Sequence, residues 1–241
     1  MAGHSAWKNI KHRKASVDAK RGKVWSKASR AIIVAARTGG ADVRFNSSLR
    51  LAIDDAKSVN MPRDTIEKAV KKGAGGLDGE EFQSIRYEGY GPGGVAVIAE
   101  VLTSNLNRTA PDIRLIFDKN GGNLGVPGSV AYGFSHAGVV VIDRAMVEEE
   151  RLMEVALDAG ADDVSDEGDV WQVTTPSANL LRLRDAIEAA GIAVSEAQVM
   201  WVPSTMVDVD AERSAQVAKL VDALEENDDV QKVYTNANAT E

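Results

Sequence analysis

Strand and helix patterns alternate between residues 138 and 202 in an order that is complete in itself, and this order constrains the fold most. Runs rich in β-branched residues predict strands, and apolar residues at a spacing of 3.6 predict helices. Strands are predicted over Gly138–Asp143, Asp162–Ser165, Val170–Thr174 and Val194–Val202, and helices over Met146–Ala159 and Ser177–Ala190. The resulting order, βαββαβ, describes a ferredoxin-like α/β domain.

The flanking patterns predict a second α/β domain that the first one interrupts. Before it lie predicted strands at Ser84–Glu88 and Val95–Thr103 and a helix at Asn107–Asn120. After it follow a strand at Met206–Val209, a helix at Ala211–Glu226 and a strand at Val230–Tyr234, which we expect to complete the sheet begun at Ser84. We therefore predict a discontinuous ferredoxin-like domain formed by residues 80–134 and 205–241, with residues 135–204 inserted as a separate domain.

The glycines between the first two strands formally match a dinucleotide-binding motif. Gly89, Gly91 and Gly94 have the spacing G-x-G-x-x-G. That site needs a helix to begin at the loop, whereas here the β-rich run from Val95 follows and Pro92 lies in the turn. The sequence therefore favours a hairpin loop.

The first 76 residues predict a helical domain preceded by a basic arm over residues 1–15. Helix one is predicted from a cap near Ser16 to Arg37, helix two from a cap at Asn46 or Ser47 to Val59, and helix three from Pro62 to Lys72, ended by Gly73. The first helix carries an expected core stripe of Val24, Ala28, Ala31, Ile32 and Ala35. We expect a three-helix bundle joined to the body by a flexible linker over residues 73–79.

Charge divides the chain at this same boundary. Residues 1–76 hold 17 Lys and Arg against 6 Asp and Glu, a net charge of +11, and the remainder holds 11 against 30, a net charge of −19. On helix one, basic residues recur beside the apolar stripe at Lys20, Lys23, Lys27, Arg30 and Arg37. A folded cationic segment is typical of a protein that binds a phosphate backbone. The alternative is a solvated basic tail beside an unrelated acidic surface.

Several motifs resemble those of the YebC family. They are Ala-Gly-His-Ser-Ala-Trp-Lys-Asn-Ile-Lys-His-Arg-Lys at 2–14, Asn-Met-Pro-Arg-Asp-Thr-Ile-Glu-Lys-Ala at 60–69, Lys-Lys-Gly-Ala-Gly-Gly at 71–76, Tyr-Glu-Gly-Tyr-Gly-Pro-Gly-Gly at 87–94 and Gly-Gly-Asn-Leu-Gly at 121–125. The resemblance covers nearly the whole chain. Its one departure is Ala6, where the family more often has a basic residue, so one phosphate contact is absent. It implies a three-domain cytoplasmic protein of a family traditionally named for transcriptional regulation, with mitochondrial members similar to translational activators.

Candidate binding residues lie in the head and in one glycine-rich loop. Phosphate contact, with base stacking by Trp7 or His12, is predicted for Trp7, Lys8, Lys11, His12, Arg13, Lys14, Lys20, Arg21, Lys23, Lys27 and Arg30. The loop from Gly121 to Ser129 is a possible second contact through Asn123, Gly125, Gly128 and Ser129, because small residues permit close backbone approach. Simple turn geometry explains this loop equally well.

Other classes of function are disfavoured by composition. The chain has no cysteine, which excludes disulfides and thiol catalysis, and no apolar run long enough to span a membrane. His4, His12 and His136 are not at metal-ligand spacing, and no nucleophile motif occurs, so we expect no metal, cofactor or small-molecule substrate. An enzyme with an unrecognised site is a remote alternative. Two main hypotheses stay open: binding of ribosomal RNA as a translation factor, which the absence of a recognition-helix signature favours, and DNA binding as a transcriptional regulator.

Overall fold

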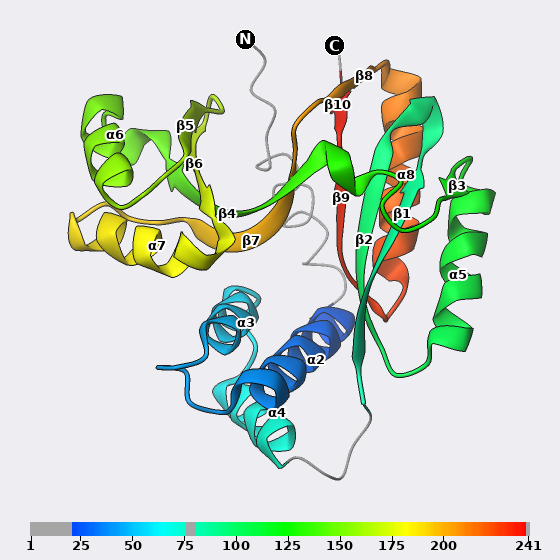
Figure 1. Cartoon of the computed structure of the whole chain (residues 1–241), viewed down its shortest axis with the longest axis horizontal. Helices are drawn as coiled ribbons and strands as arrows, with labels where there is room; N and C mark the ends of the chain where they lie inside the picture. Colours follow the sequence, from blue (N-terminus) through cyan, green and yellow to red (C-terminus); the bar gives the residue numbers. More distant parts are fainter. Residues whose placement is uncertain (1–20, 76–80, 240–241) are drawn as a thin grey trace. The chain divides into compact units, whose positions relative to one another are not determined.

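The computed structural model describes residues 21–75 and 81–239, and these fall into two compact units (Figure 1). One unit comprises residues 132–206. The other comprises residues 21–75, 81–131 and 207–239. The predicted domain boundaries at residues 76, 134 and 204 stay predictions, since contact within a unit does not show which segments fold alone.

The head consists of the three predicted helices, α2 (Arg21–Gly39), α3 (Ser47–Ser58) and α4 (Arg63–Ala74). Asn46 is the N-cap of α3, as expected, and its side-chain oxygen accepts a hydrogen bond from the Leu49 amide at 2.9 Å. Helix α4 begins at Arg63, one residue after the predicted start, and Pro62 is its N-cap residue. The predicted arm (1–15), the cap near Ser16 and part of the linker lie outside the described residues.

The core of the head differs in part from the predicted stripe. Ile32, Ile33 and Ala36 are the buried residues of α2, whereas Ala28 and Ala35 pack only at the edge of the core. The reason is that α2 packs against both α3 and α4, so its buried face is wider than one helical stripe. The two other helices and their connection contribute Leu49, Ala56, Met61, Ile66 and Ala69.

Gly73 does not end α4, contrary to the prediction, because it serves as a packing residue. An added Cβ there would lie 2.6 Å from the Ile33 carbonyl oxygen and 2.7 Å from the Ala36 Cβ. The missing side chain lets α2 and α4 approach closely, and the helix continues to Ala74.

The discontinuous α/β part combines segments from before and after the insertion. Its elements are β1 (Gln83–Tyr90), β2 (Ala96–Thr103), α5 (Leu106–Lys119), β3 (Asn123–Leu124), β8 (Val207–Val209), α8 (Ala211–Glu226), β9 (Val230–Thr235) and β10 (Ala237–Ala239). The antiparallel sheet has the order β3-β1-β2-β9, so β9 completes it as predicted. The strand expected at Met206–Val209 is present as β8, but the expectation that it joins this sheet was wrong, because β8 pairs with β10 in a separate parallel ladder.

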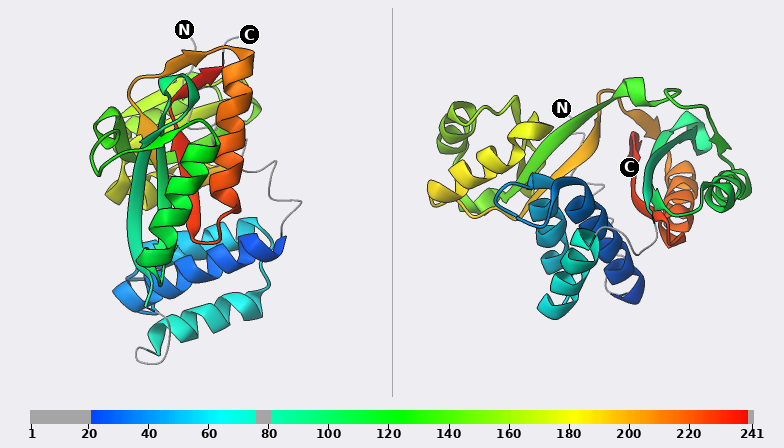
Figure 2. Two further views of the ribbon diagram at one scale, coloured as in Figure 1. Left: turned by 90° about the vertical axis from the view of Figure 1, so that its right-hand side faces the viewer. Right: turned by 60° about the horizontal axis from the view of Figure 1, so that its bottom comes forward.

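Helices α5 and α8 cover one face of this sheet, as the views in Figures 1 and 2 agree. Val97, Ala99 and Val101 of β2 alternate toward the helices and meet Phe117 and Leu220 in the core. The glycine-rich segment between β1 and β2 is a hairpin connection, with a single 3₁₀ turn at Pro92–Gly94 before β2. The hairpin prediction is therefore confirmed.

The unit of residues 132–206 has the predicted βαββαβ order. Its elements are β4 (Phe134–Asp143), α6 (Glu149–Asp158), β5 (Asp163–Asp166), β6 (Val170–Pro176), α7 (Leu180–Ala189) and β7 (Glu196–Pro203). The antiparallel sheet order β5-β6-β4-β7 is the ferredoxin-like arrangement, which confirms the mixed α+β fold class. Helix α6 begins three residues later than predicted because Asp143 caps a short 3₁₀ turn at Arg144–Met146.

Candidate nucleic-acid interface

The structure describes part of the predicted cationic surface. Seven of the assigned residues lie outside the described residues: Trp7, Lys8, Lys11, His12, Arg13, Lys14 and Lys20. Arg21 begins α2, but its side chain is also outside the description. Lys23, Lys27 and Arg30 are described, and steps of four and three residues place them on one face of α2.

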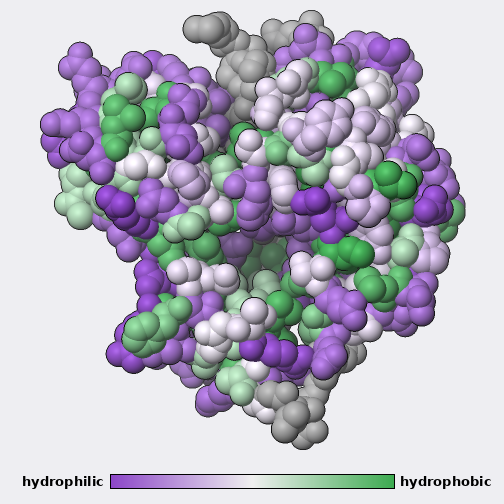
Figure 3. Space-filling model, viewed as in Figure 1, coloured by the Kyte–Doolittle hydropathy of each residue, from purple (hydrophilic) through white to green (hydrophobic). Residues whose placement is uncertain are grey.

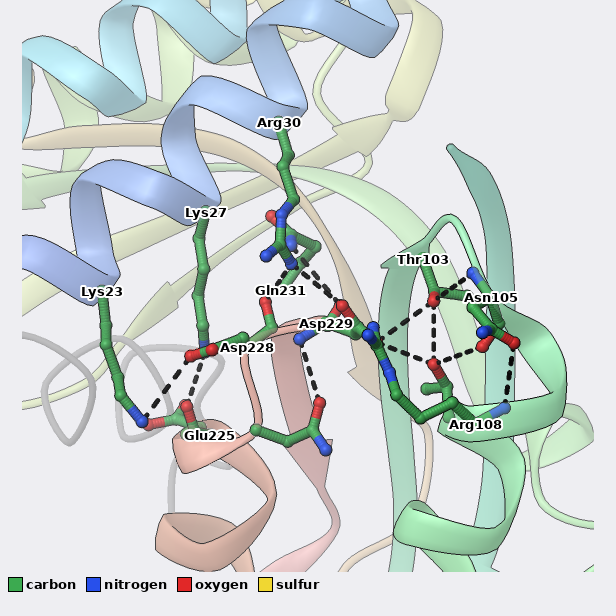
Figure 4. A network of polar contacts seen from close by, with 12 residues as sticks. Lys23, Lys27, Arg30, Thr103, Asn105, Arg108, Glu225, Asp228, Asp229 and Gln231 are labelled. Atoms are coloured by element: carbon green, nitrogen blue, oxygen red, sulfur yellow. Dashed lines mark hydrogen bonds and ion pairs between the residues drawn. The ribbon is translucent and has the colours of Figure 1, made fainter. Parts of the chain in front are cut away.

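These three cations contact the end of α8 and its connection to β9, which together we call the acidic turn (residues 225–229). Figure 4 shows all three side chains of α2 pointing toward it. The Lys23 ammonium donates to the Glu226 carbonyl at 3.0 Å, and Lys27 donates to the Glu225 carbonyl. Arg30 donates to the Asp228 carbonyl and, at 3.1 Å, to Oδ1 of Asp229. The predicted stripe thus meets anionic and carbonyl oxygen atoms within its own unit.

The two lysines of α2 stabilise the C-terminal end of α8. The last carbonyls of a helix have no partner within the helix and carry partial negative charge, which nearby cations stabilise. The last turn of α8 has no basic residue, so Lys23 and Lys27 supply the charge from α2. A helix that ends in Glu225-Glu226 without its own cation was the sequence signal for this contact, and we missed it.

Asp229 is the buried centre of the network in Figure 4. Its Oδ2 accepts hydrogen bonds from Thr109 at 2.7 Å, Arg108 at 2.9 Å and Thr103 at 3.1 Å. Burial raises the pKa of Asp229, but these hydrogen bonds and the positive charge of Arg108 outweigh burial and hold the pKa below its ordinary value. The carboxylate therefore stays charged and joins α2, β2, α5 and β9.

A second cationic group lies on α4, in the segment whose lysines the sequence predicts only as a helix end. Lys68, Lys71 and Lys72 are exposed and share one helix face, because they are three and four residues apart. No hydrogen bond or ion pair joins them to any residue in the described part of the chain. The three ammonium groups therefore form one exposed cationic face on α4.

The loop at residues 121–131 is fixed by a buried carboxylate. Oε2 of Glu88 accepts the amides of Val130 at 3.0 Å and Ala131 at 2.9 Å, and its Oε1 accepts from Arg86 Nε at 2.9 Å. Burial raises the pKa of Glu88, but the hydrogen bonds from the backbone amides and from Arg86 lower it by more than burial raises it. The pKa of Glu88 is therefore below its ordinary value. These hydrogen bonds attach the end of the loop to Glu88 of β1.

The predicted second-contact residues occupy different positions on this loop. Asn123 is exposed in β3, and Gly128 has φ of +87°, a conformation that favours glycine. Gly125 lies against Ser129, since an added Cβ would be 2.4 Å from its hydroxyl oxygen. Tyr90 donates to the Ser129 carbonyl at 2.9 Å. The geometry explains the small residues structurally, and their role in binding stays a prediction.

Neither a metal-binding cluster nor a membrane-spanning helix occurs among the described residues. Across residues 21–75 and 81–239, no three His, Asp or Glu side chains form a group that could hold a metal ion. His136 instead packs on Trp201, with ring centroids 4.8 Å apart. Among the described helices, none is long and apolar enough to cross a membrane.

Comparison with known proteins gives matches over nearly the full length. The family model described as "TACO1/YebC protein N-terminal domain" matches residues 5–76, and "TACO1/YebC second and third domain" matches residues 82–237. The chain is similar to proteins named "Probable transcriptional regulatory protein" from three bacteria. It is 51% identical to that of Rubrobacter xylanophilus (100% of this chain, 97% of the relative), 52% identical to that of Idiomarina loihiensis (100% and 97%) and 46% identical to that of Enterococcus faecalis (98% and 99%).

A solved structure shares the fold. The crystal structure of a conserved hypothetical protein from Aquifex aeolicus superposes with a TM-score of 0.86 at 45% identity, covering 99% of this chain and 98% of that one.

Proposed function

The chain belongs to the TACO1/YebC family, and from this premise we propose that it is a non-enzymatic cytoplasmic regulator that binds structured RNA on the ribosome and eases elongation. One observation carries the proposal. The first 76 residues have a net charge of +11, while the rest of the chain has −19. Such polarity favours an approach to RNA in which the head meets the phosphates and the body is repelled from them.

The head residues are assigned phosphate contacts in this proposal. Lys68, Lys71 and Lys72 bind phosphate directly, because the described part of the chain offers them no competing acceptor. Lys23, Lys27 and Arg30 exchange the oxygens of the acidic turn for phosphate oxygens, which have the same hydrogen-bonding chemistry. The residues of the basic arm add further contacts, and the loop bearing Asn123, Gly125, Gly128 and Ser129 forms a second one.

DNA binding is the alternative, and the names of the relatives favour it, since they describe transcriptional regulation. Proteins that regulate transcription by reading a duplex commonly place a recognition helix in the major groove. Nothing in the sequence of α3 or α4 marks either as such a helix. We therefore give RNA precedence.

Reversal of charge on α4 tests the proposal. The variant K68E/K71E/K72E should co-sediment with ribosomes less than the unmodified protein at moderate salt. The slope of log K against log salt should fall in magnitude by about 2, because each lost phosphate contact contributes about 0.7–0.9. The matched control is R114E/K119E/K219E, which makes the same change of charge at exposed positions of α5 and α8.

Deletion of the gene supplies the second measurement. Loss of the protein should make ribosomes pause at particular nascent sequences. If the protein instead stays off ribosomes and occupies discrete promoters, with transcript levels changing before any pausing, the DNA-binding alternative is correct.

A further inference from the structure

The connection between α2 and α3, residues 40–46, has an unusually well-fixed conformation for a short loop. The Asn46 side chain donates to the carbonyls of Ala35 at 2.8 Å and Gly40 at 2.7 Å while it caps α3. Gly40 has φ of +84°, which lets the chain reverse after α2. The Asp42 carbonyl accepts the amides of Phe45 at 3.1 Å and Asn46 at 3.0 Å. The loop therefore holds its tip in a defined position.

An aromatic ring is exposed at this tip. The Phe45 side chain is 83% exposed and the neighbouring Val43 is 39% exposed, although both are apolar. Figure 1 shows the loop projecting from the head, and Figure 3 shows hydrophobic surface at its end among hydrophilic surface. A phenylalanine that is 83% exposed buries little apolar surface in the core of the head, so the packing of the head does not account for an aromatic residue at this position.

A cation lies against the ring. The Arg44 guanidinium carbon is 5.6 Å from the Phe45 ring centroid, within the range of a cation–π contact. Asp42 accepts from this guanidinium with both carboxylate oxygens: Nε donates to Oδ1 at 3.0 Å and to Oδ2 at 3.2 Å, and Nη2 donates to Oδ2 at 2.6 Å. The hydrogen bonds from Arg44 lower the pKa of Asp42 to about 2, so the carboxylate that faces Arg44 is charged near neutral pH.

We propose that Phe45 is a stacking platform for an unpaired RNA base, with Arg44 beside it to face the adjoining phosphate. This deepens the proposed function and rests on it. Aromatic rings next to arginine are the groups that single-stranded nucleic acids contact without regard to sequence, because every base has a π-face. Phe45 lies on the head, whose positive net charge attracts the phosphates of the same RNA.

The size of the patch favours a base over a protein partner. A specific protein interface buries about 800 Å² on each partner, around a core of several apolar anchors. Of the nine large apolar side chains exposed in the described residues, only Val43 and Phe45 belong to this loop. One ring flanked by charged residues matches one base.

The test uses the full-length chain and single-stranded RNA of about 12 nucleotides that carries 5-iodouridine. We expect irradiation to cross-link the RNA to Phe45, located by mass spectrometry of the digested protein. F45A should weaken binding about 5- to 150-fold, the range measured for loss of one stacked base. F45Y and F45W should bind within twofold of the unmodified chain, whereas F45L should behave as F45A, because it keeps apolar bulk without a π-face.

The controls separate this inference from the proposed function. L115A removes an exposed apolar side chain on α5 and should bind like the unmodified protein. If the unmodified chain binds no RNA at moderate salt, the proposed function fails. If it binds and F45A or F45L binds equally well with no cross-link at Phe45, the stacking assignment alone is wrong. An F45A defect of equal size on fully duplex RNA also overturns it.

Discussion

Replacement of Asp229 by asparagine should strongly destabilise the unit formed by residues 21–75, 81–131 and 207–239. The carboxylate accepts hydrogen bonds from Arg30, Arg108, Thr103 and Thr109, and its side chain is 8% exposed. An amide at this site keeps one acceptor, but in either orientation its NH2 group faces an arginine, which can only donate. Breaking a buried ion pair on one side costs about 3–5 kcal/mol. Because the Arg108 side chain is 58% exposed and regains water, we expect about 3 kcal/mol.

The loss should depend on pH in a defined direction. The pKa of Asp229 is lower in the folded chain than in the unfolded chain, where an aspartate titrates near about 3.9. A carboxyl with a depressed pKa contributes its stabilisation above the unfolded value and loses it as the pH falls through the folded value. The difference in unfolding free energy between the unmodified protein and D229N should therefore have its full value at pH 7 and decrease below about pH 4.

Urea denaturation followed by far-ultraviolet circular dichroism measures the effect. The control is D228N, next in the chain, whose carboxylate is 64% exposed and pairs with Lys23 at 3.6 Å. Its unfolding free energy should change by less than about 0.5 kcal/mol. Equal stability of D229N and the unmodified protein at pH 7 would refute the reasoning, as would a deficit that persists unchanged at pH 3.

Two further substitutions probe the loop and the head. E88Q removes the charge that the amides of Val130 and Ala131 and the Arg86 guanidinium bind; it should lower the unfolding free energy by about 2 kcal/mol at pH 7 and accelerate hydrogen exchange of those two amides. Unaltered exchange would show that the loop is held by other contacts. G73A places a Cβ 2.6 Å from the Ile33 carbonyl oxygen and should lower the unfolding free energy by about 1–3 kcal/mol. In G75A the added Cβ lies 3.4 Å from the Lys71 carbonyl oxygen, so this substitution should be nearly neutral in thermal melts.

Sequence patterns were sufficient for the elements whose pattern is local. The βαββαβ order, the hairpin at the glycine-rich segment and the Asn46 cap depend on spacing and turn chemistry that neighbouring residues determine. Predictions were wrong where a distant segment decides the outcome. Gly73 has the position of a helix stop, yet its close contact with Ile33 comes from another helix. Likewise, β8 has a strand pattern, but its partner β10 is close to the end of the described chain.

The candidate site was less accessible to sequence reasoning than the fold. Exposure of Phe45 cannot be inferred from a periodic pattern, because a single aromatic in a short loop lies inside or outside according to the packing of helices on both sides. In the sequence, Lys71 and Lys72 indicate only a helix C-terminus. The exposed face that they share with Lys68 became visible once α4 was placed against α2.

The stripe on α2 shows why a cationic helix face does not by itself identify an external partner. The carbonyls at the end of α8 and the Asp229 carboxylate are oxygen acceptors, as phosphate is, so the same spacing of Lys23, Lys27 and Arg30 suits either. The partly buried Arg30 pair is costly to open, whereas the Lys23–Asp228 pair is largely exposed and contributes little. Phosphate should therefore displace the turn from Lys23 more readily than from Arg30. A polyanion that engages the whole stripe must compensate for a buried carboxylate left without one of its donors, while one that engages Lys68, Lys71 and Lys72 breaks no contact to another described residue.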